Sequence, residues 1–218
     1  VTGRPARLQL AKGTQFTSSI DGVTYTFRTR ESFFAKDDGT GLYVFKTTDD
    51  SENLPIVEGT EKTKTFFVPE KTERQVYVIP DETIDTSTAE VNVFESASSS
   101  SFTSYTPISQ AISVNENSTH FALNEAPNGF YELNFGDGIS FGKSPEPGEK
   151  VVVTYLSSKG ADANNGTVFT PSSDVTVNGV DYTLSVVTVT ESTGGAAKQS
   201  IESIKQLAPI AFAGQKRL

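Results

Sequence analysis

Apolar and polar residues alternate with a period of two in many stretches of the chain, which is the pattern of half-buried β-strands. Thr and Phe, which favour strands, recur there, whereas Ser, Gly and Pro gather between the stretches. Short strands separated by frequent turns predict a mainly β protein of antiparallel, sandwich-like units with tight hairpins. Strands are predicted at residues 23–27, 42–46, 65–68, 75–79, 91–95, 102–106, 119–123, 131–135, 151–155, 175–177 and 180–189.

Two of the predicted hairpins have turns of the same chemistry. Asp21-Gly22 and Asn178-Gly179 each separate strand-like runs, and such dipeptides suit the type I′ turn because both central residues need a positive φ. The residues before the two turns are also similar. Either two hairpins with similar demands use similar residues, or the chain contains an internal duplication.

One short C-terminal helix is predicted at residues 196–208, and Pro209 ends it because a proline ring clashes with a continuing helix. Ile201 and Ile204 lie on one face of this helix. A helix of this length is marginal alone and must bury its apolar face. We expect Ile201, Ile204 and Lys205 to contact either the chain's own β unit or a second copy.

The stretch from residue 81 to 101 is rich in Ser, Thr and acidic residues and predicts a boundary between two β units. We expect a first unit at residues 1–95 and a second at 96–165. Residues 166–218 would supply a hairpin and the helix, and would be able to pack with the first unit. The 218-residue chain begins without Met, so we expect it to be a piece of a longer protein.

Charge and composition exclude several classes of function. The net charge of −9 argues against a nucleic-acid partner, because affinity for nucleic acid comes mainly from Lys and Arg. The chain has no Cys, so it has no disulfide, thiol nucleophile or thiolate metal site, and it suits a reducing cytoplasm. The sequence contains no apolar run of about 18 residues, the length that would predict a membrane-spanning segment.

Signs of catalysis are few. His120 is the sole imidazole, and no G-x-S-x-G motif accompanies it. It lies in an alternating run, where a histidine on a strand face is the simpler interpretation. The sequence does not exclude a catalytic pair of carboxylates, since it does not show which acids approach each other. We expect no enzymatic activity and no cofactor.

Two Gly- and Asp-containing segments raise the question of calcium binding. Residues 136–138 and 162–166 carry oxygen ligands, but neither has the spacing of an EF-hand loop. Asp and Asn beside Gly are typical of turns, because their side chains bond nearby backbone N–H groups. We therefore predict no metal site, and a structural turn made by four residues: Gly136, Asp137, Gly138 and Gly142.

This turn is predicted to form the tip of an antiparallel hairpin at residues 129–156. The segment combines a strand ending in Phe-Gly-Asp-Gly, a Pro-x-Pro-Gly turn, a Val-Val-Val-Thr-Tyr strand, and Asn164-Asn165-Gly166 beyond it. In this order they resemble the baseplate J-like family of contractile phage tails. The Gly-Thr entry at residues 13–14 and the segment from Gly194 to Pro209 extend the resemblance, although Gln199 stands where the family commonly has Glu.

The resemblance implies a structural protein of the baseplate wedge. Such a protein would self-associate, with a homodimer as the expected unit, contact other wedge proteins and help to form a ring around the tail hub. It would need no cofactor and would reside in the virion after assembly in the host cytoplasm. Both ends of the chain are net positive and the middle is net negative, which suits contact between copies.

The competing interpretation is a carbohydrate-binding β module or adhesin of a phage tail or cell surface. The Trp residues that such modules commonly use are missing, but seven Tyr are present. Binding to a glycan array would separate the two functions. A secreted hydrolase is a third class, disfavoured by the single His.

Overall fold

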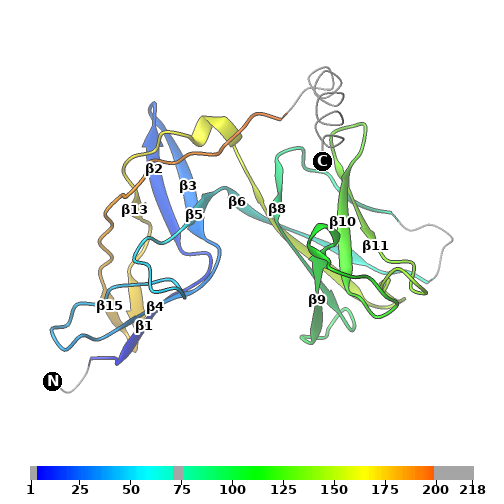
Figure 1. Ribbon diagram of the computed structural model, residues 1–218, viewed down its shortest axis with the longest axis horizontal. Helices are drawn as coiled ribbons and strands as arrows, with labels where there is room; N and C mark the ends of the chain where they lie inside the picture. Colours follow the sequence, from blue (N-terminus) through cyan, green and yellow to red (C-terminus); the bar gives the residue numbers. More distant parts are fainter. Residues whose placement is uncertain (1–3, 71–75, 199–218) are drawn as a thin grey trace, which may run out of the picture. The chain divides into compact units, whose positions relative to one another are not determined.

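The computed structural model describes residues 4–70 and 76–198 (Figure 1). The chain is mainly β, with several antiparallel sheets, which confirms the predicted fold class. It divides into two compact units, of which the first joins Val1–Val57 to Lys159–Leu218 and the second is Glu58–Ser158. The middle of the chain is thus inserted between the two segments that build the first unit.

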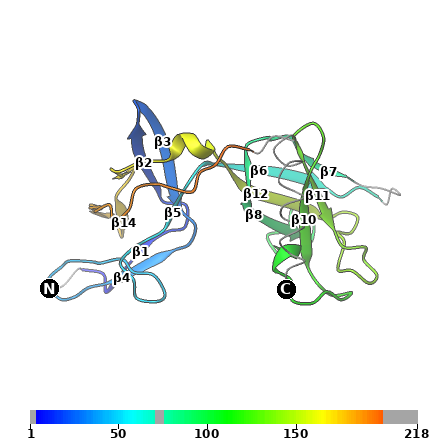
Figure 2. The ribbon, with the colours of Figure 1, turned by 45° about the horizontal axis from the view of Figure 1, so that its top comes forward.

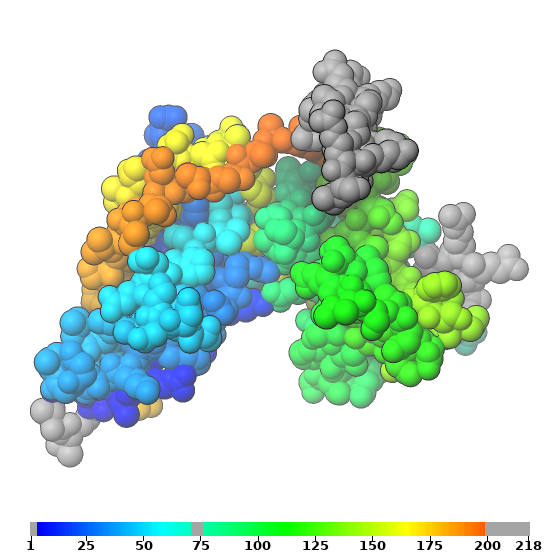
Figure 3. All heavy atoms as spheres, viewed as in Figure 1, coloured from blue at the N-terminus to red at the C-terminus, as the bar shows by residue number. Residues whose placement is uncertain are grey.

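The first unit contains a four-stranded sheet in the order β13-β2-β3-β5, a ribbon of β1 and β4, and a hairpin of β14 and β15. Figure 3 shows the blue N-terminal and the yellow-to-orange C-terminal segments side by side in this unit. Its elements are β1 (Arg7–Leu10), β2 (Gln15–Ile20), β3 (Val23–Thr29), β4 (Phe33–Lys36), β5 (Ile56–Glu58), the 3-10 helix η2 (Gly160–Ala163), β13 (Thr170–Pro171), β14 (Val175–Val177) and β15 (Val180–Tyr182).

Both predicted tight hairpins are confirmed. In the β2-β3 turn Asp21 and Gly22 have φ of 51° and 81°, and in the β14-β15 turn Asn178 and Gly179 have φ of 52° and 77°. These are the positive φ values that a type I′ turn requires at both central positions. The last strand is shorter than predicted, since β15 ends at Tyr182.

The returning segment completes the core of the first unit. Phe16, Phe27 and Phe33 are buried together with Ala163 of the returning segment. Phe169 meets Phe27 edge to face, with 4.9 Å between ring centroids, an arrangement that aromatic pairs prefer. Apolar burial therefore joins two segments that are far apart in the sequence.

The second unit is a seven-stranded sheet in the order β6-β12-β8-β9-β10-β11-β7. Figure 2 shows β10 and β11 crossing in front of β6, β12 and β8, so the sheet folds over on itself as in a sandwich. Its elements are β6 (Thr60–Phe67), β7 (Tyr77–Ile79), β8 (Ile84–Phe94), β9 (Phe102–Pro107), the 3-10 helix η1 (Ile108–Gln110), β10 (His120–Glu125), β11 (Tyr131–Phe135) and β12 (Lys150–Ser157).

The core of the second unit lies between these two layers. Ile79, Val91, Leu133, Val151 and Val153 are almost completely buried in one cluster. In β12 every second residue of Val151–Tyr155 is buried and the residues between are half-buried, as a strand with one face on the core requires. In β12 the period-two pattern of the sequence thus marks the core positions correctly.

The predicted hairpin at residues 129–156 is wrong. Strand β11 pairs with β10 and β7, whereas β12 pairs with β6 and β8. Alternation of apolar residues specifies which face of a strand is buried, but it does not specify the neighbouring strand. The segment 136–149 is therefore a connection between the two layers of the unit and not the tip of a hairpin.

The structure divides the chain at other places than the boundaries predicted after residues 95 and 165. Strands β8 and β9 pair across residue 95, so the Ser-rich run is the turn of a hairpin. Its hydroxyls accept backbone hydrogen bonds: Ser96 Oγ from Ser99 N–H at 3.1 Å, and Ser99 Oγ from Ser101 N–H at 3.0 Å. Turn residues therefore do not mark a unit boundary. The described residues from 166 to 198 belong to the first unit, as the sequence analysis allowed.

Candidate functional site

A groove of about 660 Å³ lies in the first unit. Its apolar lining includes Phe34, Leu42 and Val44, whose side chains are exposed. Its charged lining includes three cations, which are Arg7, Lys36 and Lys46, and four carboxylates, which are Glu31, Asp38, Asp50 and Glu52. Strand β4 and residues 38–52 thus form a surface that combines apolar contact with charges of both signs.

The cations of β1 and β4 both reach the groove because buried and exposed residues alternate in each strand and the exposed residues of the two strands lie opposite each other. Leu8 and Ala35 face the core, and their neighbours Arg7 and Lys36 face outward directly opposite each other. Phe34 is the diagonal neighbour of Arg7, and the guanidinium Cζ lies 3.5 Å from the centroid of its ring. This stacking holds the Arg7 guanidinium against an aromatic surface.

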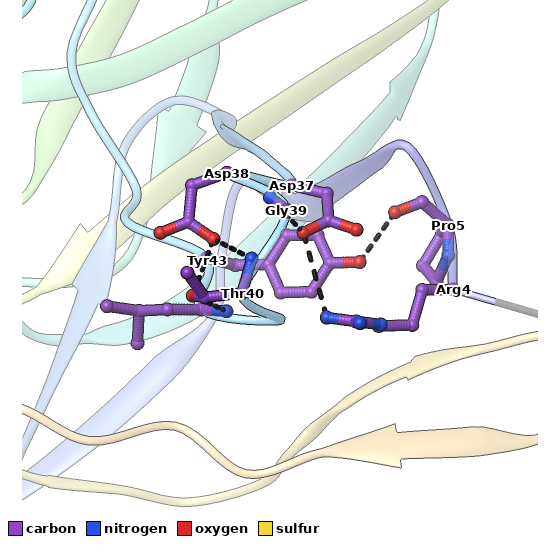
Figure 4. Close-up of polar contacts among 8 residues, drawn as sticks. Arg4, Pro5, Asp37, Asp38, Gly39, Thr40 and Tyr43 are labelled. Atoms are coloured by element: carbon purple, nitrogen blue, oxygen red, sulfur yellow. Dashed lines mark hydrogen bonds and ion pairs between the residues drawn. The ribbon is translucent and has the colours of Figure 1, made fainter. Parts of the chain in front are cut away.

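The segment that follows β4 is a series of turns held by its own carboxylates (Figure 4). Asp37 Oδ1 accepts a hydrogen bond from Gly39 N–H at 2.9 Å. Asp38 Oδ1 accepts bonds from the Thr40 hydroxyl at 2.7 Å and the Thr40 N–H at 2.8 Å. These bonds, the hydroxyl bond first, lower the pKa of Asp38, and they hold this side of the groove in one conformation.

The same segment is tied to the residues that precede β1. The Tyr43 hydroxyl donates a hydrogen bond to Pro5 O at 2.6 Å, and the Arg4 guanidinium lies 3.9 Å from the Asp37 carboxylate (Figure 4). Burial, and then the negative charge of Asp37, raise the pKa of Tyr43. The predicted strand at residues 42–46 is wrong, because this segment makes only isolated bridges, from Tyr43 to Asp37 and from Lys46 to Phe34.

Lys46 is neutralised inside the groove. Its ammonium lies 3.2 Å from Asp50 and 3.7 Å from Glu52, and the hydrogen bond with Asp50 is the main reason that its pKa is raised. Within residues 4–70 and 76–198, neither Arg7 nor Lys36 has an ion-pair partner. The groove therefore has two unneutralised cations side by side.

The four predicted turn residues lie in one loop of the second unit. Asp137 Oδ1 accepts three hydrogen bonds, from the N–H groups of Ile139, Ser140 and Phe141, at 2.9, 2.8 and 2.8 Å. These bonds, the one from Phe141 first, lower the pKa of the Asp137 carboxyl. One oxygen therefore organises the whole loop.

The glycines of this loop are required by its geometry. Gly138 and Gly142 have φ of 72° and 94°, and the Gly138 N–H donates to Gly142 O at 2.9 Å. A side chain at Gly136 would collide with the backbone of Phe141 and Gly142. Glycine alone permits this approach, so the Gly-Asp-Gly sequence is explained by the backbone.

Replacing Asp137 with Ala is expected to lower the melting temperature by a few degrees, because three backbone N–H groups lose their acceptor. Asp137→Asn keeps an acceptor oxygen and should lower it less. Calorimetry with and without calcium measures both effects. An unchanged melting temperature of Asp137→Ala, combined with the loss of a calcium-dependent stabilisation, would show that Asp137 is a metal ligand.

The second candidate calcium segment also has a structural role. Asn164 follows η2, and its side chain makes two hydrogen bonds with Gly195: Nδ2 donates to Gly195 O at 2.8 Å, and Oδ1 accepts from Gly195 N–H at 3.0 Å. Asn165 has φ of 67°. No group of three or more His, Cys, Asp or Glu residues that could hold a metal ion occurs in the described part of the chain.

A polar cluster around the buried Asp81 of the second unit was missed by the sequence analysis. The Asp81 carboxylate lies 2.8 Å from the Lys62 ammonium and accepts bonds from the N–H and hydroxyl of Thr83 at 3.0 and 2.6 Å. Burial raises the pKa of Tyr155 to about 12, and the charge of Asp81 and a hydrogen bond to it add to this effect. Asp81-x-Thr83 is a local turn signal, but Lys62 and Tyr155 come from other strands.

His120 lies on a strand face, as expected. Its Nδ1 is 2.8 Å from the Thr106 hydroxyl oxygen, and the two residues are directly paired between the parallel strands β9 and β10. The candidate interface residues of the predicted C-terminal helix, Ile201, Ile204 and Lys205, lie outside the described residues.

No family model matches the chain, and no curated protein matches it. A search of the described residues for a helix long and apolar enough to cross a bilayer found none.

Proposed function

We propose that the chain is a structural component of a contractile phage tail baseplate wedge. In this role it self-associates, contacts other wedge proteins and helps to form a ring around the tail hub. It acts without catalysis or cofactor, and it resides in the virion after assembly in the host cytoplasm. The proposal rests on the order of motifs between residues 129 and 166 and on the geometry of one loop.

That loop is the observation that carries the proposal. Asp137 binds three successive N–H groups, and the loop so formed presents Ile139 and Phe141 with 77% and 72% of their surfaces exposed. A neighbouring loop is joined to it by a 2.8 Å hydrogen bond from Lys143 N–H to Ser118 O and exposes Ile112. Large apolar side chains exposed to solvent on an ordered loop are typical of protein–protein contact sites.

Sedimentation equilibrium over a wide concentration range tests the self-association. We expect the chain to form dimers or larger assemblies, and Ile139→Ser with Phe141→Ser to weaken the association at least tenfold, because the exposed apolar surface is lost. Phe67→Ser, which changes an exposed phenylalanine of the same unit, is the matched control and should leave the association unaltered. A strictly monomeric chain at every concentration contradicts the proposal.

The alternative of a carbohydrate-binding module makes a different prediction at the groove of the first unit. Phe34 is the exposed aromatic side chain in its lining, and a sugar ring would have to stack on it. Arg7 already lies over that ring, so a sugar would have to use the other face or displace the guanidinium. Binding of the chain to a glycan array, lost in Phe34→Ala, would favour the module over the wedge component.

A further inference from the structure

The pairing of Arg7 with Lys36 is unfavourable in the free protein. The two residues are direct cross-strand neighbours in the antiparallel β1-β4 ribbon, and both side chains are exposed on the same face. Like charges in this arrangement repel each other and destabilise a sheet. A fold can hold such a pair at little net cost if an anion lies between the two cations when the protein is in use.

Arg7 and Lys36 differ from Lys46, the third cation of the groove, in the charges that surround them. Lys46 is neutralised by Asp50 and Glu52, whereas Arg7 and Lys36 have no carboxylate partner in the part of the chain that the structure describes. The Arg7 guanidinium is held in place by its stacking on Phe34. Its donors are thus positioned but not satisfied by an internal acid, and a guanidinium matches a carboxylate in a two-bond geometry.

The apolar lining narrows the class of ligand. Phe34, Leu42 and Val44 expose carbon surface in the same groove as the two cations. The groove volume of about 660 Å³ falls in the range of sites that take a ligand larger than a simple ion. A ligand that fits must therefore place a negative group beside aliphatic groups.

We propose that this groove binds a short extended segment of another protein, with an Asp or Glu side chain of that segment between Arg7 and Lys36. An adjacent apolar side chain of the segment packs on Phe34, Leu42 and Val44. This inference goes beyond the proposed assembly role and is independent of it, because it rests on the groove alone.

Polyanions fit the groove less well than a single carboxylate. Glu31, Asp38, Asp50 and Glu52 also line it, and they would repel the successive phosphates of a nucleic acid or a polyphosphate. One carboxylate needs only the two cations of the ribbon. A protein segment supplies that single charge together with apolar neighbours.

The groove is preorganised for such a ligand. Asp37 and Asp38 close the turns at Gly39 and Thr40, and the Tyr43 hydroxyl ties the same segment to Pro5 (Figure 4). A binding surface that is already ordered loses less conformational freedom when the ligand arrives. The side of the groove that contributes Leu42 is therefore ready to receive an extended chain.

A positional library of acetylated, amidated pentapeptides tests the proposal by binding to the immobilised chain. We expect enrichment of Asp or Glu at one position with aliphatic residues beside it, and amide shifts of the selected peptide's complex in NMR at Arg7, Phe34 and Lys36. Lys36→Gln should weaken binding of that peptide about tenfold, and Lys36→Arg should retain it.

Any one of the following results overturns the proposal. One is a library without acidic preference, and another is a set of amide shifts outside the groove. A third is binding of inorganic phosphate as tight as that of the best peptide, which would indicate a simple anion site. Concentration-dependent shifts of the groove amides without peptide would show that a second copy fills it. That last result would contradict the peptide site while supporting self-association, so the two proposals fail separately.

The variant Lys36→Glu separates a binding role from a structural one. A glutamate opposite Arg7 turns a repulsive pair into an attractive one, so the melting temperature should rise while binding of the selected peptide is lost. Lys143→Glu, a matched change in the second unit, should alter neither. A Lys36→Glu variant that melts lower than the unaltered chain, or that binds the peptide as tightly, contradicts the proposal.

Discussion

Phe121→Ala is expected to lower the free energy of unfolding of the second unit by about 3–5 kcal/mol, the range for removing a buried phenylalanine. Phe121 is 3% exposed and belongs to the main cluster of the unit. It lies in β10, where it pairs with Phe135 of β11 and with Pro107 of β9. The cavity would therefore open where the two layers of the unit join.

Phe67→Ala is the matched control for this prediction, since Phe67 belongs to the same unit but is 63% exposed. Its loss should change the free energy of unfolding by less than about 1 kcal/mol. Urea denaturation followed by far-UV circular dichroism measures both variants. Equal losses for Phe121→Ala and Phe67→Ala would contradict the position of the core between the layers.

Asp81→Asn is expected to lower the free energy of unfolding at pH 7 by roughly 2 kcal/mol. Burial alone raises the pKa of the Asp81 carboxyl, but hydrogen bonds from Lys62 and Thr83 and the Lys62 charge outweigh it and lower the pKa to about 2. The Asp81 side chain is 8% exposed and that of Lys62 is 46% exposed. Solvent therefore screens part of the attraction, which keeps the loss below that of a fully buried pair.

The loss should depend on pH in a defined direction. The folded pKa lies below the ordinary value of 3.8, so the stabilisation by the carboxylate is complete above about pH 4 and is lost as pH falls through about 2. Asp81→Asn and the unaltered chain should thus converge in stability in acid. Urea denaturation at pH 7 and at points down to about pH 2 measures this convergence.

Asp85→Asn is the matched control, because Asp85 of β8 likewise accepts bonds from the N–H and hydroxyl of the residue two positions later, Ser87. Lys62 pairs with Asp81 and not with Asp85, so Asp85→Asn should lose less stability at pH 7 than Asp81→Asn. A difference between Asp81→Asn and the unaltered chain that is the same at every pH would contradict the ion pair as its origin.

The candidate sites show which features a sequence can reveal. Asp137 and its glycines were predicted as a turn because their hydrogen bonds join residues within four positions of each other. The Asp81 cluster was missed because Lys62 and Tyr155 reach it from β6 and β12. The repulsive pair of Arg7 and Lys36 was missed for the same reason, since the register of β1 against β4 brings the two together.

The sequence by itself determined the features that depend on local backbone demands and on the period of burial. The Asp21-Gly22 and Asn178-Gly179 turns form because few other residues tolerate the φ values that they need. Most of the alternating runs became strands, and in β12 the alternate apolar residues Val151 and Val153 lie inside as the pattern requires. These features arise within a few residues, so the amino acids present are enough to specify them.

Only the tertiary structure decided which strands pair, where the units divide and which charges meet. Period-two burial is satisfied by any neighbour that covers the apolar face, so it did not show that β11 and β12 belong to different layers. Burial of Phe27 against Phe169 joined the two ends of the chain into one unit. Such choices depend on apolar area shared by segments far apart in the sequence, which no local pattern contains.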